Sequence, residues 1–362
     1  MAGLNGFSKK LTDAPEAITF DDVLLQPGYS EVAISDIDVS TFVTRKLKIQ
    51  VPIVSSPMDT VTEGKLAAAV ALRGGVGVVH YNIPIAKQVE HVAHVKAQNL
   101  PVGAAVGPHD DERVSALLAK EVDFLVIDTA HGFRKTVIDA VKRYKKLGAD
   151  VVAGNIVSAD AAEQMVSAGA DGLRVGLGPG SICTTRIITG IGVPQLTAVS
   201  EVADIAAQHK IPVIADGGIK YSGDLAKAIA AGASAGMLGN IFAGTDESPG
   251  EKIEVDGQTF KKYRGMGSVE SLKANYANRY DAFKKSLVPE GVSGLTKYRG
   301  TVEDVITQFE GGLRKAMVYV GAKSLAEFQK KARFVRITSS GFTESHPHSL
   351  MDMDDTLNYS KR

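Results

Sequence analysis

Most of the chain alternates between short apolar runs and longer segments with helical periodicity. Eight short runs rich in small and β-branched residues are expected to be strands, at 52–56, 75–80, 102–107, 123–129, 150–155, 172–176, 212–216 and 236–239. Between most of them apolar residues recur at helical spacing, at 62–73, 85–96, 112–120, 134–147, 159–168, 198–209 and 223–231. Near-continuous apolar strands that alternate with helices indicate a parallel sheet covered on both faces. Eight such units favour a closed (β/α)8 TIM barrel within the α/β class.

Four segments depart from this rhythm. Residues 1–50 form a lead-in, in which 39–49 alternates like a short hairpin. The interval between the sixth and seventh strands takes about 40 residues, twice the length of an ordinary βα unit. A polar, glycine-rich stretch at 242–312 precedes the next clear helix, predicted at 312–320, and the tail at 338–362 is expected to be extended. Long insertions on a barrel are usually lids or binding loops, so we expect 242–312 to contain a flap.

Composition narrows the class of protein. The 362 residues are 44% hydrophobic and 23% charged, as in an ordinary globular protein, and we expect one catalytic domain over 1–362. The 41 basic and 41 acidic residues balance, so no general attraction to nucleic acid or anionic membranes is expected. The one cysteine excludes an intrachain disulfide and favours a cytoplasmic location. The first ten residues lack the apolar core of a signal peptide, and no apolar run approaches the ~20 residues of a membrane span.

The most informative stretch is 176–186, GLGPGSICTTR, which contains that one cysteine, Cys183. Three glycines and a proline before the thiol indicate tight turns and a close approach of the backbone to a neighbouring group. Thr184 and Thr185 place hydroxyls beside the sulfur. A lone cysteine is more often a small buried apolar residue, but this setting at a strand end is typical of a nucleophile.

Other predicted strand ends carry polar residues where barrel active sites lie. Glycine-rich turns after the seventh and eighth strands match the usual barrel phosphate site, although they can also be plain βα turns. The candidate phosphate ligands are Ser181, Gly218, Gly239 and Asn240. Asp128 and Asp216 end two strands, where each can bind a ribose diol or cap a helix.

Two histidine-containing features are weaker. His131 follows the fourth strand and has the chemistry of an acid or base, but the sequence supplies no partner for it. The segment Glu344-Ser345-His346-Pro347-His348 has two histidines, but no cysteine or acidic cluster supports a zinc site there.

Seven motifs together resemble the IMP dehydrogenase family and cover nearly the whole chain in the family's order. They are FDDVLL at 20–25, SSPMDTVTE at 55–63, GPGSICTT at 178–185, IADGGI at 214–219, KYRGMGS at 262–268, RY at 279–280 and ESH at 344–346. The resemblance implies oxidation of inosine 5′-monophosphate (IMP) to xanthosine 5′-monophosphate (XMP) with NAD, a step of guanine nucleotide synthesis. Cys183 would attack C2 of the base. After hydride transfer, a flap carrying Arg279 and Tyr280 would close, and these residues with Thr185 would activate the hydrolytic water.

The resemblance also implies the ligand contacts. IMP would meet Ser56, Met58, Asn155, Ser181, Asp216, Gly218, Gly239, Asn240, Tyr263, Met266, Gly267 and Glu290. NAD would meet Asp128, Ala130 and Gly176. A potassium ion would be held by the carbonyls of Gly178, Gly180 and Cys183, with Glu344, Ser345 and His346 supplied by a neighbouring subunit of a homotetramer.

One departure from the family pattern concerns regulation. The family usually carries a tandem CBS module after the second helix, but here only residues 97–100 connect that helix to the third strand. A module of ~120 residues, a normal domain size, has no room there. We therefore expect no nucleotide regulation through that module. Two alternatives to the dehydrogenase are a GMP reductase, which shares the barrel and cysteine loop, and a non-catalytic nucleotide-binding barrel.

Overall fold

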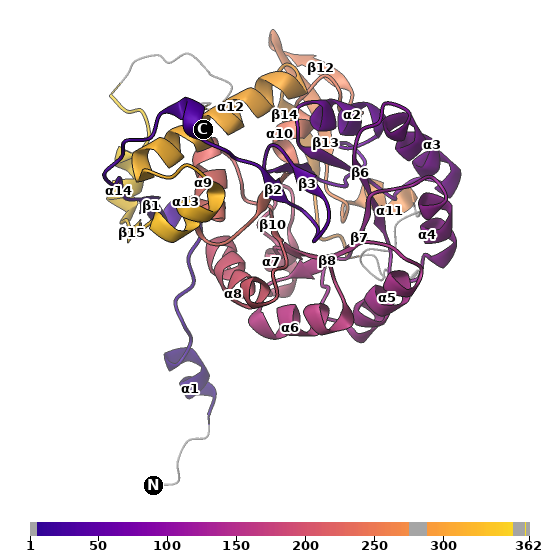
Figure 1. Ribbon diagram of the computed structural model, residues 1–362, viewed down its shortest axis with the longest axis horizontal. Coiled ribbons are helices and arrows are strands. Elements are labelled where there is room, and N and C mark those ends of the chain that lie inside the picture. Colours follow the sequence, from indigo (N-terminus) through magenta and orange to yellow (C-terminus); the bar gives the residue numbers. More distant parts are fainter. Residues whose placement is uncertain (1–5, 275–287, 350–358, 360–362) are drawn as a thin grey trace.

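The computed structural model describes residues 6–274, 288–349 and 359, and contains a closed barrel of eight parallel strands (Figure 1). In barrel order from β4 the strands run β4, β5, β6, β7, β8, β9, β10 and β11, so each strand pairs with its neighbours in sequence. Their bounds are β4 (Ile53–Ser55), β5 (Val76–Val79), β6 (Val102–Val106), β7 (Phe124–Asp128), β8 (Val151–Ile156), β9 (Gly172–Val175), β10 (Val213–Asp216) and β11 (Ala235–Leu238). The predicted (β/α)8 barrel is confirmed.

Helices surround the barrel in a ring (Figure 1). They are α2 (Gly64–Leu72), α3 (Ile85–Lys96), α4 (Asp111–Leu118), α5 (Lys135–Lys146), α6 (Ala159–Ala168), α8 (Gln195–Gln208), α9 (Ser222–Ala230) and α12 (Val302–Val320). In α5 the buried residues are Val137, Ala140, Val141 and Tyr144, whose spacing gives one apolar stripe against the strands. The seven predicted helices are therefore present, with α8 beginning at residue 195 rather than 198.

Alternate residues of the strands face opposite sides of the barrel wall. Val126 belongs to an apolar cluster that also contains Val54, Val78 and Ile214, whereas its neighbour Leu125 belongs to the larger cluster that includes helix residues. The strands are thus buried on both faces, as expected for a parallel barrel. Because all eight run in one direction, their carboxyl ends meet at one end of the barrel, where the βα loops lie.

The segment after β11 is an ordered substructure rather than a plain loop. It contains α10 (Asn240–Ala243), α11 (Val269–Ala274) and an antiparallel sheet of β12 (Lys252–Val255), β13 (Gln258–Arg264) and β14 (Ser293–Lys297). The predicted start of the following helix at 312 is wrong, because α12 begins at Val302. Thr301 caps it by accepting a hydrogen bond from the Asp304 amide, and burial of the flanking apolar side chains keeps Gly311 and Gly312 helical.

The terminal regions pack together along one side of the barrel. The expected hairpin is present as β2 (Thr41–Phe42) and β3 (Lys48–Ile49), and β1 (Val23–Leu25) pairs antiparallel with β15 (Phe334–Arg336). The tail beyond 338 is not wholly extended, because α14 (Ser339–Glu344) is a helix whose cap, Thr338, accepts a hydrogen bond from the Gly341 amide. The remaining helices are α1 (Phe7–Thr12), which stands away from the body in Figure 1, α7 (Thr185–Thr189) and α13 (Leu325–Lys331).

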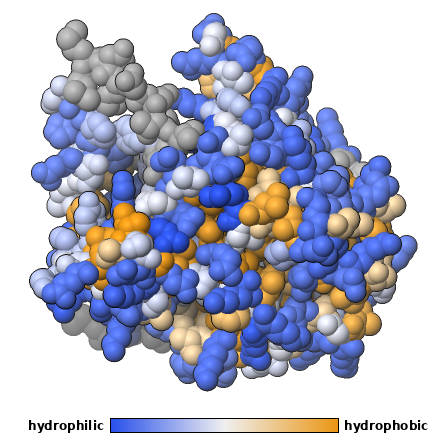
Figure 2. All heavy atoms as spheres, turned by 45° about the horizontal axis from the view of Figure 1, so that its top comes forward, coloured by the Kyte–Doolittle hydropathy of each residue, from blue (hydrophilic) through white to orange (hydrophobic). Residues whose placement is uncertain are grey.

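The molecular face in Figure 2 is mainly hydrophilic, with apolar patches of limited size. Over the described ranges, the helices are too short or too polar for any of them to cross a membrane.

Candidate active site

Two joined cavities lie at the carboxyl ends of the strands. The first, of about 100 Å³, contains Cys183, and the second, of about 450 Å³, extends toward the turns after β10 and β11. They share the lining residues Ser56, Met58, Pro179, Gly180, Asp216, Gly217 and Tyr263. A molecule with a base at one end and a phosphate at the other therefore has a continuous path through both.

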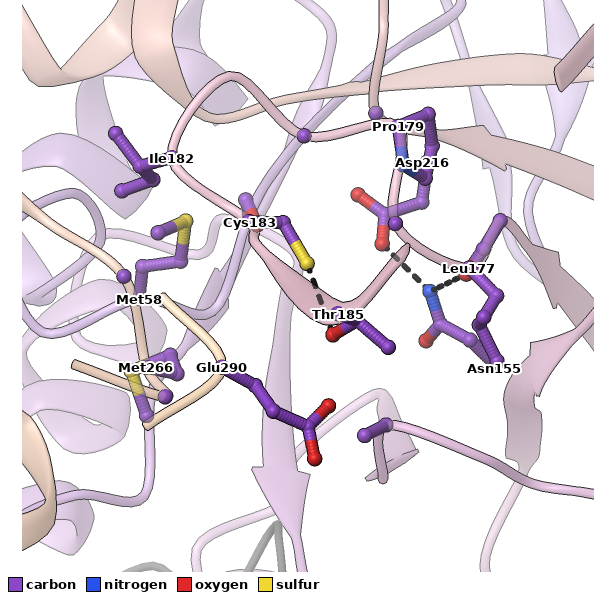
Figure 3. Close-up of a pocket in the computed structure, with 18 of the residues that line it drawn as sticks. Met58, Asn155, Leu177, Pro179, Ile182, Cys183, Thr185, Asp216, Met266 and Glu290 are labelled. Carbon is purple, nitrogen blue, oxygen red and sulfur yellow. Dashed lines mark hydrogen bonds between the residues drawn. The ribbon is translucent and has the colours of Figure 1, made fainter. Parts of the chain in front are cut away.

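The loop after β9 brings the thiol into the first cavity. Gly176 has φ of +145°, and a Cβ added there would lie 2.1 Å from the Asp216 carbonyl oxygen, so only glycine fits. Farther along, the Cys183 amide donates to the Gly180 carbonyl over 3.1 Å, which forms a tight turn. The half-buried Cys183 thiol lies 3.2 Å from the Thr185 hydroxyl oxygen, and Figure 3 shows the two side chains facing each other.

The same loop is attached to the segment that precedes β14. The Thr184 amide donates to the Glu290 carbonyl, and the Val292 amide donates to the Ile182 carbonyl, both over 3.0 Å. This short antiparallel bridge places Glu290 in the lining of the first cavity. Residues more than 100 positions apart thus form one wall around the sulfur.

The opposite wall is a buried network of charged and polar side chains. Arg174, in β9, is 1% exposed and binds both Asp128 and Asp216, with Nε and Nη2 at 3.0 and 2.9 Å from Asp216 Oδ2. Asn155 donates to the same Oδ2 and to the Gly176 carbonyl, over 2.8 Å each. Figure 3 shows Asn155 and Asp216 on one side of Cys183 and Met58, Ile182 and Met266 on the other.

Asp128 does not present its carboxylate to the cavity. Its side chain is fully buried and pairs with Arg174, and neither cavity is lined by it. Of the three residues predicted to meet NAD, only Ala130 and Gly176 line the first cavity. Arg174 binds Oδ1 of this carboxylate, and the contact of Asp128 with NAD stays a prediction.

The predicted phosphate ligands line the second cavity. Ser181, Gly218, Gly239 and Asn240 all belong to it, with Tyr263 at the junction of the two cavities. The Tyr263 hydroxyl lies 3.7 Å from the Met58 sulfur, and burial raises the pKa of Tyr263 far above its ordinary value. This hydroxyl is therefore a neutral hydrogen-bond donor at physiological pH.

The predicted contacts to the base lie together as well. Met58, Met266, Gly267 and Glu290 all line the first cavity. Met58 is followed in the chain by Asp59. The buried Asp59 carboxylate accepts two hydrogen bonds of 3.0 Å from Arg264 and so fixes this part of the backbone. Asn82 and Ser271 also donate to Asp59. The end of β4 and the root of α11 are thus fixed to each other on this side of the site.

The six predicted potassium ligands fall into two groups. Gly178, Gly180 and Cys183 lie in the loop after β9. By contrast, Ser345 and His346 line a different cavity beside α9, and His346 packs against Phe342 with ring centroids 4.5 Å apart. Within the ranges described, no cluster of three His, Cys, Asp or Glu side chains is arranged to hold a metal ion.

The remaining predictions have mixed outcomes. His131 is exposed and lines neither cavity. Arg279 and Tyr280 lie outside the described residues. Sequence reasoning missed Arg174, although a charged residue inside the apolar strand Gly172–Val175 was a usable signal. It also missed the fully buried Gln195, whose Nε2 donates to the Val175 and Asp216 carbonyls.

Comparison with known proteins places this arrangement among nucleotide oxidoreductases. Residues 17–348 match the family model described as IMP dehydrogenase / GMP reductase domain. The inosine-5′-monophosphate dehydrogenase of Cryptosporidium parvum is 41% identical over 393 positions, covering 96% of this chain and 98% of that protein. The enzymes of the same name from Methanocaldococcus jannaschii and Borreliella burgdorferi are each 40% identical, covering 98% and 93% of this chain and 99% and 98% of their own lengths.

The lengths of these alignments differ. The alignment with the Methanocaldococcus jannaschii enzyme takes 492 positions, which exceeds the 362 residues of this chain by 130. That relative therefore carries segments absent from this chain.

Proposed function

The chain belongs to the IMP dehydrogenase / GMP reductase family, and from this premise we propose that it is an NAD-dependent dehydrogenase that oxidises IMP to XMP. The observation that carries the proposal is the Cys183 thiol in a cavity that continues into a glycine-rich phosphate pocket. We assign the 5′-phosphate of IMP to the second cavity. The hypoxanthine ring stacks in the first cavity, beside Met58 and Met266. The product is a precursor of guanine nucleotides.

The ribose is held between the two cavities by the charged wall. Asp216 lines both cavities, and its carboxylate is fixed by Arg174 and Asn155. The side-chain amide oxygen of Asn155, Oδ1, has no hydrogen-bond partner among the described residues, although Asn155 is only 3% exposed. Buried polar atoms normally have partners, so we assign this oxygen and Asp216 to the ribose hydroxyls.

The chemistry takes place in two steps at C2 of the base. Cys183 adds to C2 through its thiolate, and the hydrogen on C2 leaves as hydride, so that a covalent nucleotide–cysteine intermediate remains. NAD, when bound next to Ala130 and Gly176, supplies the hydride acceptor. Water then adds to C2, the C–S bond breaks, and XMP and the free thiol are released.

Hydride transfer needs a dry site, whereas hydrolysis needs a positioned water. We propose that the flap carrying Arg279 and Tyr280 separates the two steps by closing after the first. Thr185 is well placed to help in the second, because its hydroxyl lies 3.2 Å from the sulfur. Glu290 lines the same cavity and supplies an acceptor for a ring N–H of the base.

A monovalent cation fits the loop. Carbonyl oxygens are hard ligands suited to potassium, and the loop supplies those of Gly178, Gly180 and Cys183. Ser345 and His346 of the same chain line a separate cavity, so we propose that the other three ligands come from a neighbouring subunit of a homotetramer. The cytoplasmic location and the single domain over 1–362 stay predictions.

The first experiment is a spectrophotometric assay with IMP, NAD and potassium, followed by one with GMP and NADPH. We expect NADH to form in the first mixture and no oxidation of NADPH in the second. If NADPH is oxidised in the second mixture and no NADH forms in the first, the chain is a reductase. Inactivity in both mixtures would favour a non-catalytic nucleotide-binding barrel.

A further inference from the structure

The two ends of the Cys183 loop are joined by one side chain from its middle. Arg186, in α7, donates from Nε to the Leu177 carbonyl over 2.9 Å and from Nη2 to the Val193 carbonyl over 2.6 Å. Leu177 follows β9 and Val193 precedes α8, so these carbonyls mark the start and finish of the loop. A planar guanidinium with donors in fixed directions can bind both at once.

The chain has glycine at the two places where this side chain crosses it. A Cβ added at Gly178 would lie 2.5 Å from Arg186 Cγ, and one added at Gly192 would lie 2.6 Å from Arg186 Nε. Such contacts are shorter than van der Waals packing allows, so any larger residue would displace the guanidinium. The passage for Arg186 is therefore built from both sides of the loop.

The bridge acts on the part of the loop that carries the sulfur. Cys183 lies three residues before Arg186, and the Thr189 hydroxyl donates to the Thr185 carbonyl over 2.7 Å within the same helix. The far side of the turn is fixed to Glu290 and Val292 by the backbone bonds described above. Without Arg186, that side would stay attached while the two ends of the loop came apart.

We propose that Arg186 is a positioning residue, whose guanidinium ties the ends of the loop together and so holds the Cys183 sulfur where it reacts. The proposal rests on the function assigned above. Burial lowers the pKa of Arg186 and the nearby Cys183 opposes this effect, but an arginine remains protonated at neutral pH. The required property is the direction of two donors rather than the charge alone.

A competing role follows from the place of Arg186 in the lining of the second cavity. An arginine that binds the 5′-phosphate directly would mainly raise KM for IMP. An arginine that positions the nucleophile would mainly lower kcat, because a displacement of about 1 Å at the reacting atoms can cost on the order of 100-fold.

The test compares Arg186→Ala and Arg186→Lys with Arg336→Ala. The control removes an exposed arginine of β15 that forms an ion pair with Glu16. We expect both Arg186 variants to lose about 10- to 100-fold in kcat, with KM for NAD unchanged. Guanidinium ion should partly restore Arg186→Ala, and Arg336→Ala should behave as wild type. Cys183 is the one cysteine, so labelling by iodoacetamide reports on this residue alone. Protection of Cys183 by saturating IMP shows that the Arg186 variants still bind substrate.

Gly192→Ala provides a second route, because it crowds the guanidinium and leaves the arginine in the chain. It should lower kcat in the same way, which keeps the proposal testable if Arg186→Ala does not fold. Full activity of Arg186→Lys, or a rise in KM for IMP with kcat unchanged, would overturn the positioning role. Wild-type enzyme that makes no NADH from IMP would refute the proposed function instead, so the two failures are distinguishable.

Discussion

The site has two halves that are built differently. The wall of Asn155, Arg174 and Asp216 consists of buried side chains that bind one another, and each is fixed by at least two contacts. The loop around Cys183 has three glycines in residues 176–186, and among the described residues the sulfur has one hydrogen-bond contact, to the Thr185 hydroxyl at 3.2 Å. We infer that the wall binds and orients the nucleotide while the loop carries out the chemistry.

The largest expected effect comes from the loop. Cys183→Ala removes the group that forms the covalent bond, so turnover should fall by at least about 1,000-fold. IMP binding, followed by calorimetry, should persist because the wall and the phosphate pocket remain. Stability to urea should change little, since Cys183 is only half-buried. Turnover near the wild-type rate would remove the distinction between a binding half and a reacting half.

The wall should respond in the opposite way. Arg174→Met leaves two carboxylates without their shared cation, and breaking a buried ion pair typically costs about 3–5 kcal/mol. Urea unfolding should show a loss of that size, accompanied by weaker IMP binding. Arg336→Met is the matched control, because its pair with Glu16 is exposed and such pairs contribute about 0–1 kcal/mol. Equal stability of the two variants would show that the wall is not the rigid half.

Exchange of the monovalent cation probes the loop without a mutation. Replacing potassium with lithium should lower turnover severalfold, because the smaller ion does not suit several carbonyls of the Cys183 loop at once. The urea midpoint should not move, since the barrel does not depend on this loop for its core. Unchanged turnover in lithium would argue against a cation at Gly178, Gly180 and Cys183.

The smallest effect concerns a group in neither half. Burial lowers the pKa of His91 from 6.5, so the unfolded chain binds a proton more readily than the folded one. Stability is therefore fully present above pH 6.5 and falls as the pH drops below it. The expected loss is small, because a single half-buried side chain contributes it. His91→Gln should flatten this dependence; a pH profile unaffected by His91→Gln would contradict the assignment.

The contrast between the halves also explains what could be predicted from sequence. The barrel followed from eight apolar runs, and the loop was visible because glycines and one cysteine stand together in the sequence. Arg174 was missed because its partners, Asp128 and Asp216, lie 46 and 42 residues away and meet only when the barrel closes. The burial of Asp128 against Arg174 was likewise not visible in the sequence, since nothing local indicates that the two residues meet.

Errors at the element ends have local causes. A helix start was predicted at 312, but Thr301 caps the helix, which begins at Val302. The tail was expected to be extended, yet Thr338 begins the short helix Ser339–Glu344. In both places a capping threonine was the stronger signal.

The most direct test of the account is intact-protein mass spectrometry of enzyme quenched during turnover with IMP and NAD. The account predicts a population that carries one covalently bound nucleotide, located on Cys183 by peptide mapping and absent from Cys183→Ala. Steady NADH formation with no adduct at any quench time, or an adduct at another residue, would contradict the claim that this loop carries the nucleophile.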